Sequence, residues 1–343
     1  MNQAIKDEII RLAGAENVLA NEPMARHTTF RVGGPADLLV CPKNPELLRE
    51  LVVVLEKNGE PYQLIGRGSN LLVSDEGYRG VILALCDLKR EPGTDAHLEA
   101  DEGSRTADSE SESESEHENL TDEGTCLPGL LAVSADGTKI TAGAGVSLGR
   151  TAGIAYRLGL GGMEFAAGIP GSVGGAIVMN AGAYGGEMKQ IVSAVTLLDP
   201  SGEIRRLSTE EMHFGYRTSL LKEIKAVVLS AEFTLTPEDP AQIREKMDDF
   251  AARRRDKQPL NYPSAGSTFK RPEGHFAGQL IEEAGLRGFR IGDAQVSEKH
   301  CGFVINRGAA TASQIRELIS EVQRRVYEQS GIHLETEVIL LGE

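Results

Sequence analysis

A serine within a loop of small residues is the first candidate for chemistry in this sequence. Ser267 stands in the stretch NYPSAGSTFK, residues 261–270. In hydrolases a nucleophilic serine is often found in the pattern G-x-S-x-G, but here Ala265 and Phe269 occupy the two glycine positions. A serine hydrolase that pairs Ser267 with one of the seven histidines, of which His275 is nearest in sequence, is therefore one hypothesis among several.

Two glutamates near the end of the chain could supply a second reactive group. The stretch LETEVILLG predicts a strand, and alternation along it places four side chains on one face: Glu335, Glu337, Ile339 and Leu341. Burial and a neighbouring like charge both raise the pKa of a carboxyl group, which favours a protonated hydrogen-bond donor. Two ionised surface glutamates are the competing interpretation.

Two glycine clusters could bind phosphate. IGRGSNLL places Gly66, Gly68 and Asn70 directly after an apolar stretch, and glycines let backbone N–H groups approach a phosphate without interference from a Cβ atom. The second cluster, AGIPGSVGGAIVMNAGAYGG, surrounds Pro170 with Gly168, Gly171, Gly174, Gly175, Gly182, Gly185 and Gly186. Together the loops could hold the two phosphates of one dinucleotide. The alternative is that they are tight turns between strands.

A third glycine motif is interpreted as structural. KITAGAGVSLG contains G-x-G-x-x-x-G between a predicted strand and a predicted helix. The third glycine comes one position later than in the Rossmann dinucleotide fingerprint, and no full α/β repeat follows. The motif therefore predicts a turn.

The elements that must position these residues alternate between strands and helices. PELLRELVVVLEKNG predicts a helix with one apolar face that stops at Asn58-Gly59. Strands are expected at YQLIG, LLVSD, GVILAL and KITAGAG, followed by a helix at SLGRTAGIAYRLGL that is capped by Ser147. Further strands are expected at AIVMN, VSAVTLLD, IRRLS and AVVLSAEFTLT.

The remainder of the chain has a different character and indicates a second domain. DPAQIREKMDDFAARRRDKQPL predicts a charged helix opened by Asp239 and Pro240, so a domain boundary is expected near Pro237 to Pro240. Helices are then expected at GQLIEEAGL and TASQIRELISEVQRRVYEQSG, with strands near GFRIGDAQVS, CGFVINRG and LETEVILLG. The mixture predicts an α+β fold.

The net charge of −15 is concentrated in one segment. Between Glu99 and Glu123 there are eleven Asp or Glu residues and one Arg, interspersed with serines. Such a segment repels itself and buries little apolar area, so it predicts a disordered loop insertion. A phosphorylated switch or a binder of basic partners is the alternative. The rest of the chain is only mildly acidic, which disfavours a role with nucleic acid.

Compartment can also be predicted from composition. The chain has no long apolar run at either end, so neither a membrane span nor a signal peptide is expected. Its four cysteines are far apart and form no C-x-x-C pair, which predicts reduced thiols, no metal site and a cytoplasmic location.

The motifs, taken in order, resemble one enzyme family. They are TTFRVGG (28–34), IGRGSNLLVSD (65–75), AGIPGSVGGAIVMNAGAYGGE (167–187), FGYRTSLLK (214–222), SAGSTFKRP (264–272), AGQLIEEAGLRG (277–288) and LETEV (334–338). This ordered set closely resembles the UDP-N-acetylenolpyruvoylglucosamine reductases of bacterial cell-wall synthesis. Because the interval between Arg217 and Ser267 is short, the chain is similar to the compact branch that lacks an extra tyrosine-bearing loop.

The resemblance implies a two-lobed FAD-binding fold of the vanillyl-alcohol-oxidase-like (PCMH) type with a C-terminal α+β substrate domain. The expected parts are lobe 1 at 1–88, the acidic insertion at 89–126, lobe 2 at 127–236 and the substrate domain at 237–343. For the last strand two positions are left open, within the substrate domain or paired with the FAD-binding part. The insertion departs from the family pattern.

The resemblance also implies the reaction. It is NADPH-dependent reduction of UDP-N-acetylglucosamine enolpyruvate to UDP-N-acetylmuramate, with non-covalent FAD delivering hydride from N5 to the enolpyruvyl β-carbon. Negative charge then develops on the substrate carboxylate as an enediolate, which requires cationic or donating groups and a proton source. A monomer without nucleic-acid or membrane partners is expected.

Family positions assign roles to individual residues. Arg217 matches the carboxylate-binding arginine, Ser267 the proton donor to the α-carbon, and Glu337 the group that stabilises the enediolate. Tyr216 matches a substrate-contacting position, and Lys270 is included as a substrate-binding residue because it lies near Ser267. The residues expected to line FAD are Gly66, Arg67, Gly68, Ser69, Asn70, Leu71, Pro170, Gly171, Gly174, Gly175, Asn180 and Gly182. Another FAD-dependent oxidase or dehydrogenase of the same fold is the alternative, and it would keep the glycine loops without the Arg217, Ser267 and Glu337 set.

Overall fold

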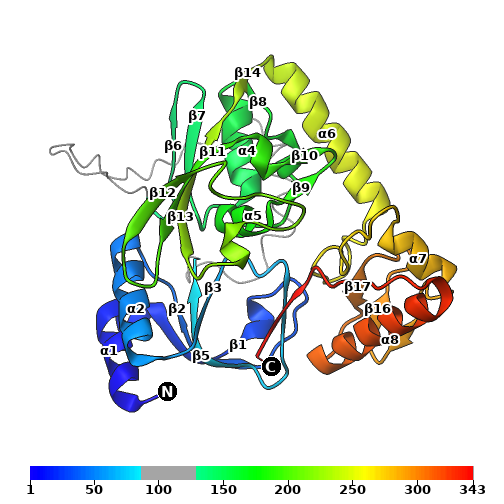
Figure 1. The fold of residues 1–343 in the computed structure, drawn as a ribbon, viewed down its shortest axis with the longest axis horizontal. Helices are drawn as coiled ribbons and strands as arrows, with labels where there is room; N and C mark the ends of the chain where they lie inside the picture. The colour runs from blue at the N-terminus through cyan, green and yellow to red at the C-terminus, as the bar shows by residue number, and fades with distance from the viewer. Residues whose placement is uncertain (86–128, 343) are drawn as a thin grey trace.

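The computed structural model describes residues 1–85 and 129–342, which form three parts packed side by side (Figure 1). The predicted acidic insertion at 89–126 lies outside the described residues.

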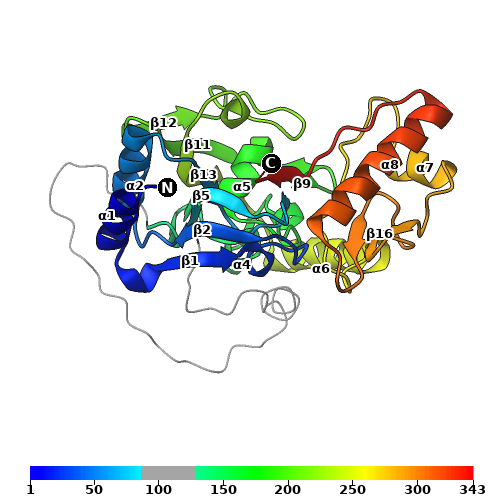
Figure 2. The same cartoon turned by 90° about the horizontal axis from the view of Figure 1, so that it is seen from below.

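The first part is a four-stranded sheet with two helices. Its helices and strands are α1 (Gln3–Ala13), β1 (Val18–Pro23), β2 (Pro35–Val40), α2 (Pro45–Asn58), β3 (Tyr62–Ile65), β4 (Leu71–Val73) and β5 (Tyr78–Ala84). The sheet order is β1-β2-β5-β3, and β5 pairs in parallel with both neighbours. Figures 1 and 2 place α1 and α2 side by side. Ile9 of α1 and Leu48 and Leu51 of α2 are fully buried.

Helix α2 confirms its prediction. The Asn44 side chain accepts a hydrogen bond from the Leu47 N–H, and Gly59 ends the helix at φ 64°. The sequence did not predict α1, β1 or β2.

The second part is a five-stranded antiparallel sheet, order β12-β11-β13-β7-β6, with helices packed against it. Its helices and strands are β6 (Val133–Asp136), β7 (Lys139–Gly143), α4 (Leu148–Arg157), β8 (Leu160–Gly161), α5 (Val173–Met179), β9 (Gly182–Ala183), β10 (Gly186–Glu187), β11 (Val192–Leu198), β12 (Ile204–Ser208), β13 (Val227–Thr234) and β14 (Thr236–Pro237). Ser147 caps α4 as predicted, by accepting from the Arg150 N–H.

The predicted strand AIVMN is wrong, because these residues form the end of α5. Ser172 caps this helix by accepting from the Gly175 N–H, and Asn180 ends it at φ 41°. A short apolar run does not distinguish a strand from a buried helix, and Ile177 and its neighbours favoured the strand through β-branching. The consequence is that the second glycine cluster opens a helix.

The strand predicted at KITAGAG is confirmed as β7, and the turn predicted from the glycine motif KITAGAGVSLG follows it at Ala144 and Gly145. A Cβ atom at Gly143 would overlap the Gly129 carbonyl, so the glycine permits close backbone approach.

The third part is built on a small antiparallel sheet, order β15-β16-β17. Its helices and strands are α6 (Pro240–Lys257), α7 (Ala277–Glu283), β15 (Arg290–Ile291), β16 (Ala294–Val296), β17 (Val304–Asn306), α8 (Ala312–Ser330) and β18 (Ile339–Leu341). Helix α6 runs from the second part to the third (Figure 1) and is capped by Asp239, as predicted.

The last strand leaves the third part and pairs in parallel with β4 of the first (Figures 1 and 2). Buried Phe30, Val32 and Leu72 of the first part also belong to the hydrophobic core of the third. The two parts are therefore joined by a strand pair and by a shared core. Within the described ranges, no helix is both long and apolar enough to cross a bilayer.

Candidate active site

Arg217 lies in a tight turn, where its backbone is held at φ 55°. Its Nε donates to Glu337 Oε1 at 2.7 Å, and its Nη2 donates to the Gly182 carbonyl at 3.1 Å. A non-glycine residue in the left-handed region is strained, and such strain concentrates at functional sites. The turn thus directs the guanidinium toward both the second glycine cluster and the end of the chain.

Glu337 lies two residues before the start of β18, with its side chain only 15% exposed. Burial raises the pKa of the Glu337 carboxyl, while Arg217 and Lys270 act in the opposite direction. The site therefore holds a carboxyl that takes up a proton more readily than an ordinary glutamate does, beside a permanent cation.

The expected pairing of Glu335 and Glu337 on one strand face is wrong. The strand begins only at Ile339, and the segment before it is held by a single bridge between Thr336 and Phe269. Glu335 is 73% exposed and pairs with Lys270 instead. The raised pKa of Glu337 thus has burial as its cause, without a like charge from Glu335.

Ser267 is exposed on a loop whose neighbouring residue is tightly fixed. The Thr268 N–H donates to the Gly302 carbonyl at 2.9 Å, and the Thr268 hydroxyl accepts from the Val304 N–H at 3.0 Å. The Glu337 N–H donates to the Thr268 carbonyl at 2.9 Å. Ser267 is consequently one residue from a direct backbone contact with Glu337.

Tyr216 and Lys270 flank these three residues. The Arg217 guanidinium lies 5.2 Å from the centroid of the Tyr216 ring, and the Tyr216 hydroxyl accepts from the Arg271 N–H at 3.0 Å. Lys270 Nζ donates to Glu335 at 3.0 Å. Arg217, Glu337, Tyr216 and Lys270 are therefore linked by contacts at one place in the fold, and Ser267 adjoins them through its neighbour Thr268.

A pocket of about 460 Å³ opens beside Tyr216, and sequence reasoning did not single it out. Its wall continues from Arg271 to Phe276, and the Arg271 guanidinium lies 3.8 Å from the centre of the Phe276 ring. In the sequence, this pocket is indicated by the cluster of cationic and aromatic residues directly after Lys270.

The two glycine clusters face each other. A Cβ atom at Gly66 would overlap the Ser172 hydroxyl, and one at Gly171 would contact Ser69 Oγ at 3.8 Å. Gly68, at φ 61°, packs directly against the His27 carbonyl. The first loop is therefore closely packed at Gly66 and Gly68, where a Cβ atom has no room, whereas Gly171 of the second loop makes ordinary contacts.

Hydrogen-bond donors remain free in the first loop. In the described chain, the backbone N–H groups of Gly68, Ser69 and Asn70 donate to no other protein group. The buried hydroxyl of Thr29, whose N–H donates to the Gly68 carbonyl at 3.2 Å, has no partner among the described residues either. Unpaired donors on a glycine-rich loop fit the phosphates of a dinucleotide such as FAD.

Donors in the second loop are mostly used inside the protein. The N–H groups of Gly171, Gly174 and Gly175 donate to Ile169, Ala144 and Ser172. A Cβ at Gly174 would lie 3.0 Å from Ala144 Cβ, so glycine at this position permits close packing of the loop against Ala144. Pro170 precedes them and is half-buried.

Asn180 and Asn70 connect the loops to the reactive residues. Buried Asn180 donates to the Gly215 carbonyl at 3.0 Å, which fixes the turn before Arg217. Asn70 donates to the Glu337 carbonyl at 3.0 Å. Arg67 lies half-buried in the first loop, and Leu71 begins β4. In the part of the chain that the structure describes, no group of three or more His, Cys, Asp or Glu side chains could hold a metal ion.

Comparison with known proteins yields two matching family models. The model described as "UDP-N-acetylenolpyruvoylglucosamine reductase, C-terminal domain" matches residues 258–341, and the model described as "FAD binding domain" matches residues 123–208. These matches and the structure confirm the predicted fold class, an FAD-binding fold with an additional C-terminal domain.

Relatives match along the whole chain. The chain is 43% identical to the UDP-N-acetylenolpyruvoylglucosamine reductase of Clostridioides difficile over 342 residues, covering 100% of this chain and 99% of that protein. It is also 43% identical to the protein of the same name from Agathobacter rectalis, with both covered completely. The crystal structure of the corresponding reductase from Thermus caldophilus is similar with a TM-score of 0.69 and 31% identity, covering 94% of this chain and 98% of that one.

Proposed function

The chain belongs to the UDP-N-acetylenolpyruvoylglucosamine reductase family, and from this premise we propose that Arg217, Glu337 and Ser267 carry out the substrate half of its reaction. The chain is an FAD-dependent oxidoreductase that uses NADPH to reduce UDP-N-acetylglucosamine enolpyruvate to UDP-N-acetylmuramate, a precursor of peptidoglycan. The observation that supports the proposal most strongly is the 2.7 Å ion pair between Arg217 and Glu337, which are 120 positions apart in the sequence.

When bound, FAD would supply hydride to the enolpyruvyl β-carbon, and two loops of the chain would hold it. Free N–H groups of Gly68, Ser69 and Asn70 are suited to its phosphates, and the glycines of the second loop permit its close approach. Asn70 contributes both to cofactor binding and to the arrangement of the catalytic residues. Its backbone N–H is suited to a phosphate of FAD, and its side chain donates to the Glu337 carbonyl.

Arg217 orients the substrate carboxylate. Its guanidinium is already fixed by Glu337 and the Gly182 carbonyl, so little freedom is lost when a second carboxylate binds. A planar, permanently charged fork also stabilises the negative charge that moves onto this carboxylate as hydride arrives.

Glu337 assists at the same carboxylate. With its pKa raised by burial, the carboxyl can take a proton and donate a hydrogen bond to the developing enediolate.

Ser267 completes the addition by giving its hydroxyl proton to the α-carbon. The electron pair of the carbon–carbon double bond, displaced by the incoming hydride, forms the new C–H bond with this proton. Because Ser267 is exposed, its oxygen can be reprotonated from solvent. A general acid of this kind contributes about 10²- to 10⁴-fold to rate.

A serine substitution tests these roles. Ser267→Ala is expected to leave reduction of the flavin by NADPH unchanged, while reoxidation of the flavin by UDP-N-acetylglucosamine enolpyruvate slows by about 10²- to 10⁴-fold. Stopped-flow absorbance separates the two half-reactions, and Ser264→Ala in the same loop is the matched control. Equal slowing of both half-reactions, or a normal rate of reoxidation, would contradict the role of Ser267.

The remaining features follow from the same premise. We place the enzyme in the cytoplasm, where its nucleotide substrate and NADPH are available, and we expect it to work as a monomer. The division into lobe 1 (1–88), insertion (89–126), lobe 2 (127–236) and substrate domain (237–343) is retained as part of the proposal.

A further inference from the structure

We infer that Asp75 is a positioning residue: it binds the N-terminus of α8 to the first lobe and thereby sets the position of Ser267 relative to the FAD-binding loops. The inference rests on the proposed role of Ser267. Asp75 belongs to the first lobe and α8 to the C-terminal part, so the contact joins two parts of the molecule.

The N-terminus of α8 depends on Asp75 for half of its capping. Asp75 accepts from the N–H groups of Ala312 and Ser313, both at 2.8 Å, and from the Ser313 hydroxyl at 2.6 Å. The helix's own cap, Thr311, accepts from the Gln314 N–H at 3.1 Å. Since the first four N–H groups of a helix lack partners within it, Asp75 supplies acceptors that the C-terminal part does not supply itself.

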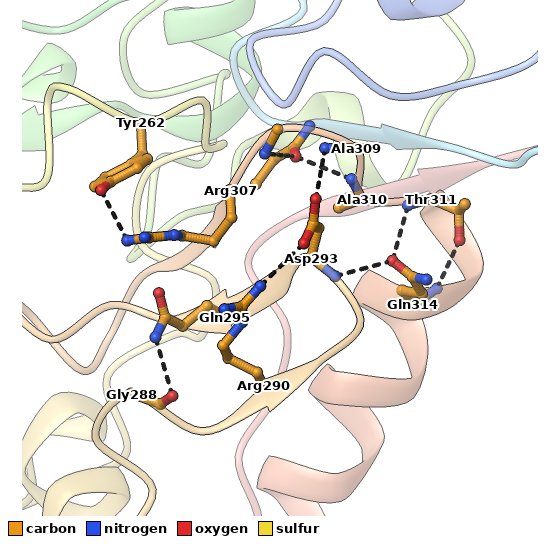
Figure 3. Close-up of polar contacts among 12 residues, drawn as sticks. Tyr262, Gly288, Arg290, Asp293, Gln295, Arg307, Ala309, Ala310, Thr311 and Gln314 are labelled. Carbon is orange, nitrogen blue, oxygen red and sulfur yellow. Dashed lines mark hydrogen bonds and ion pairs between the residues drawn. The ribbon is translucent and has the colours of Figure 1, made fainter.

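Several hydrogen bonds hold the loop that leads into α8. Figure 3 shows Gln314 accepting from the N–H groups of Thr311 and Asp293, and Asp293 accepting from the Ala309 N–H. Displacement of the helix N-terminus would therefore move β16 and its connecting loop as well.

Asp75 is also connected to the FAD-binding loop. It lies two residues after β4, and Asn70 lies immediately before this three-residue strand. Strand β4 pairs with β18, whose first residue, Ile339, donates its N–H to the Asn70 carbonyl at 3.0 Å. Strand β4 thus follows directly on Asn70, the last residue of the FAD-binding loop, and leads to Asp75, which binds α8.

A continuous path of contacts leads from α8 to Ser267. Helix α8 packs on the small sheet at β15 and β16, and β16 pairs with β17 at Val296 and Val304. The Val304 N–H donates to the hydroxyl of Thr268, the neighbour of Ser267. At the end of the same strand, the Asn306 side chain donates to the Phe30 carbonyl of the first lobe at 3.0 Å.

The simpler alternative is that Asp75 only stabilises the helix, and a matched pair of variants separates the two. Thr311→Ala removes the cap that α8 supplies itself, whereas Asp75→Ala removes the cap that comes from the first lobe. Both should lower the melting temperature. Only loss of the contact between the parts should change the geometry at Ser267.

The test measures both half-reactions by stopped flow. For Asp75→Ala and Asp75→Asn, flavin reoxidation by UDP-N-acetylglucosamine enolpyruvate should slow by about 10- to 100-fold, the cost of a small misplacement of a reacting group. Reduction by NADPH should stay within about twofold of wild type, and Thr311→Ala should leave both rates unchanged. Asp75→Ala rates that match those of Thr311→Ala, or equal slowing of both half-reactions, would overturn the inference.

Two additions keep the test decisive. If Asp75→Ala does not fold, Ser313→Ala removes one hydroxyl contact and should slow only reoxidation, by a smaller factor; unchanged reoxidation would overturn the inference.

Hydrogen exchange gives a readout without substrate: Asp75→Ala should increase exchange at the amides of Ala312, Thr268 and Val304, and unchanged exchange at the last two would contradict the path. If wild-type flavin is not reoxidised by the substrate, the proposed function itself fails, a result distinct from these.

Discussion

At the scale of single residues, the site places two charged groups, the Arg217 guanidinium and the Glu337 carboxyl, in direct contact. Arg217 holds the Glu337 carboxylate at 2.7 Å, while burial raises the pKa of Glu337. A substrate carboxylate that binds Arg217 brings a second negative charge close to Glu337. Protonation of Glu337 removes this repulsion and creates a donor, so substrate binding and proton uptake at Glu337 should be linked.

This linkage predicts a pH effect on the substrate half-reaction. Because the active form of Glu337 is proposed to be the protonated one, the rate of reoxidation should fall as pH rises through its raised pKa. In Glu337→Gln, whose amide stays neutral and can still donate, this fall should disappear. Stopped-flow rates measured across pH provide the check.

Two variants control for this effect. Glu335→Gln, at the exposed neighbouring glutamate, should keep the wild-type pH profile. Glu337→Ala, which loses the donor entirely, should reoxidise about 10²- to 10³-fold more slowly than wild type. A Glu337→Gln profile with an unchanged alkaline fall would assign the titration to another group.

Residue types in the site could be predicted from sequence, but not their partners. The resemblance identified Arg217, Ser267 and Glu337, and these lie in one connected region. Strand alternation wrongly paired Glu335 with Glu337, because the strand starts only at Ile339. Alternation applies only inside a continuous ladder, and sequence alone did not show where this ladder begins.

At the scale of elements, residues that cap helices predicted secondary structure more reliably than short runs of apolar residues. Asn44, Ser147 and Asp239 each accept hydrogen bonds at the helix starts where the sequence predicts helices. In contrast, AIVMN was predicted as a strand and is a helix, although Ser172 before it is also a cap. The glycines between them hid this signal, since glycine is unfavourable inside a helix.

The glycine loop gives a prediction at this scale. Gly68→Ala should abolish retention of FAD, because a methyl group there would overlap the His27 carbonyl and force the loop away from the cofactor. Gly59→Ala is the matched control: its φ is also near +60°, but nothing lies within 4 Å. It should lower the free energy of unfolding by only about 1 kcal/mol and leave the flavin spectrum intact.

Chemical denaturation and the visible spectrum of the purified variants provide the measurements. A Gly68→Ala protein that keeps its flavin, with a stability loss equal to that of Gly59→Ala, would show that close packing at Gly68 is not needed for cofactor binding.

At the scale of the whole molecule, the joining of the parts could not be predicted from sequence in detail. Asp75, Phe30 and Leu72 belong to the first part of the structure, yet they contact or share the core of the third. Their sequence neighbours look like ordinary strand and loop residues. Contacts between residues more than 200 positions apart depend on the complete fold, which local patterns do not encode.

This chain reduces an enolpyruvyl nucleotide sugar with electrons from NADPH. The most direct measurement is NADPH oxidation by the purified yellow protein, followed with and without UDP-N-acetylglucosamine enolpyruvate. Rapid oxidation is expected only when this substrate is present, with UDP-N-acetylmuramate formed in equal amount. A colourless protein, or NADPH oxidation that is the same without the substrate, would contradict this expectation.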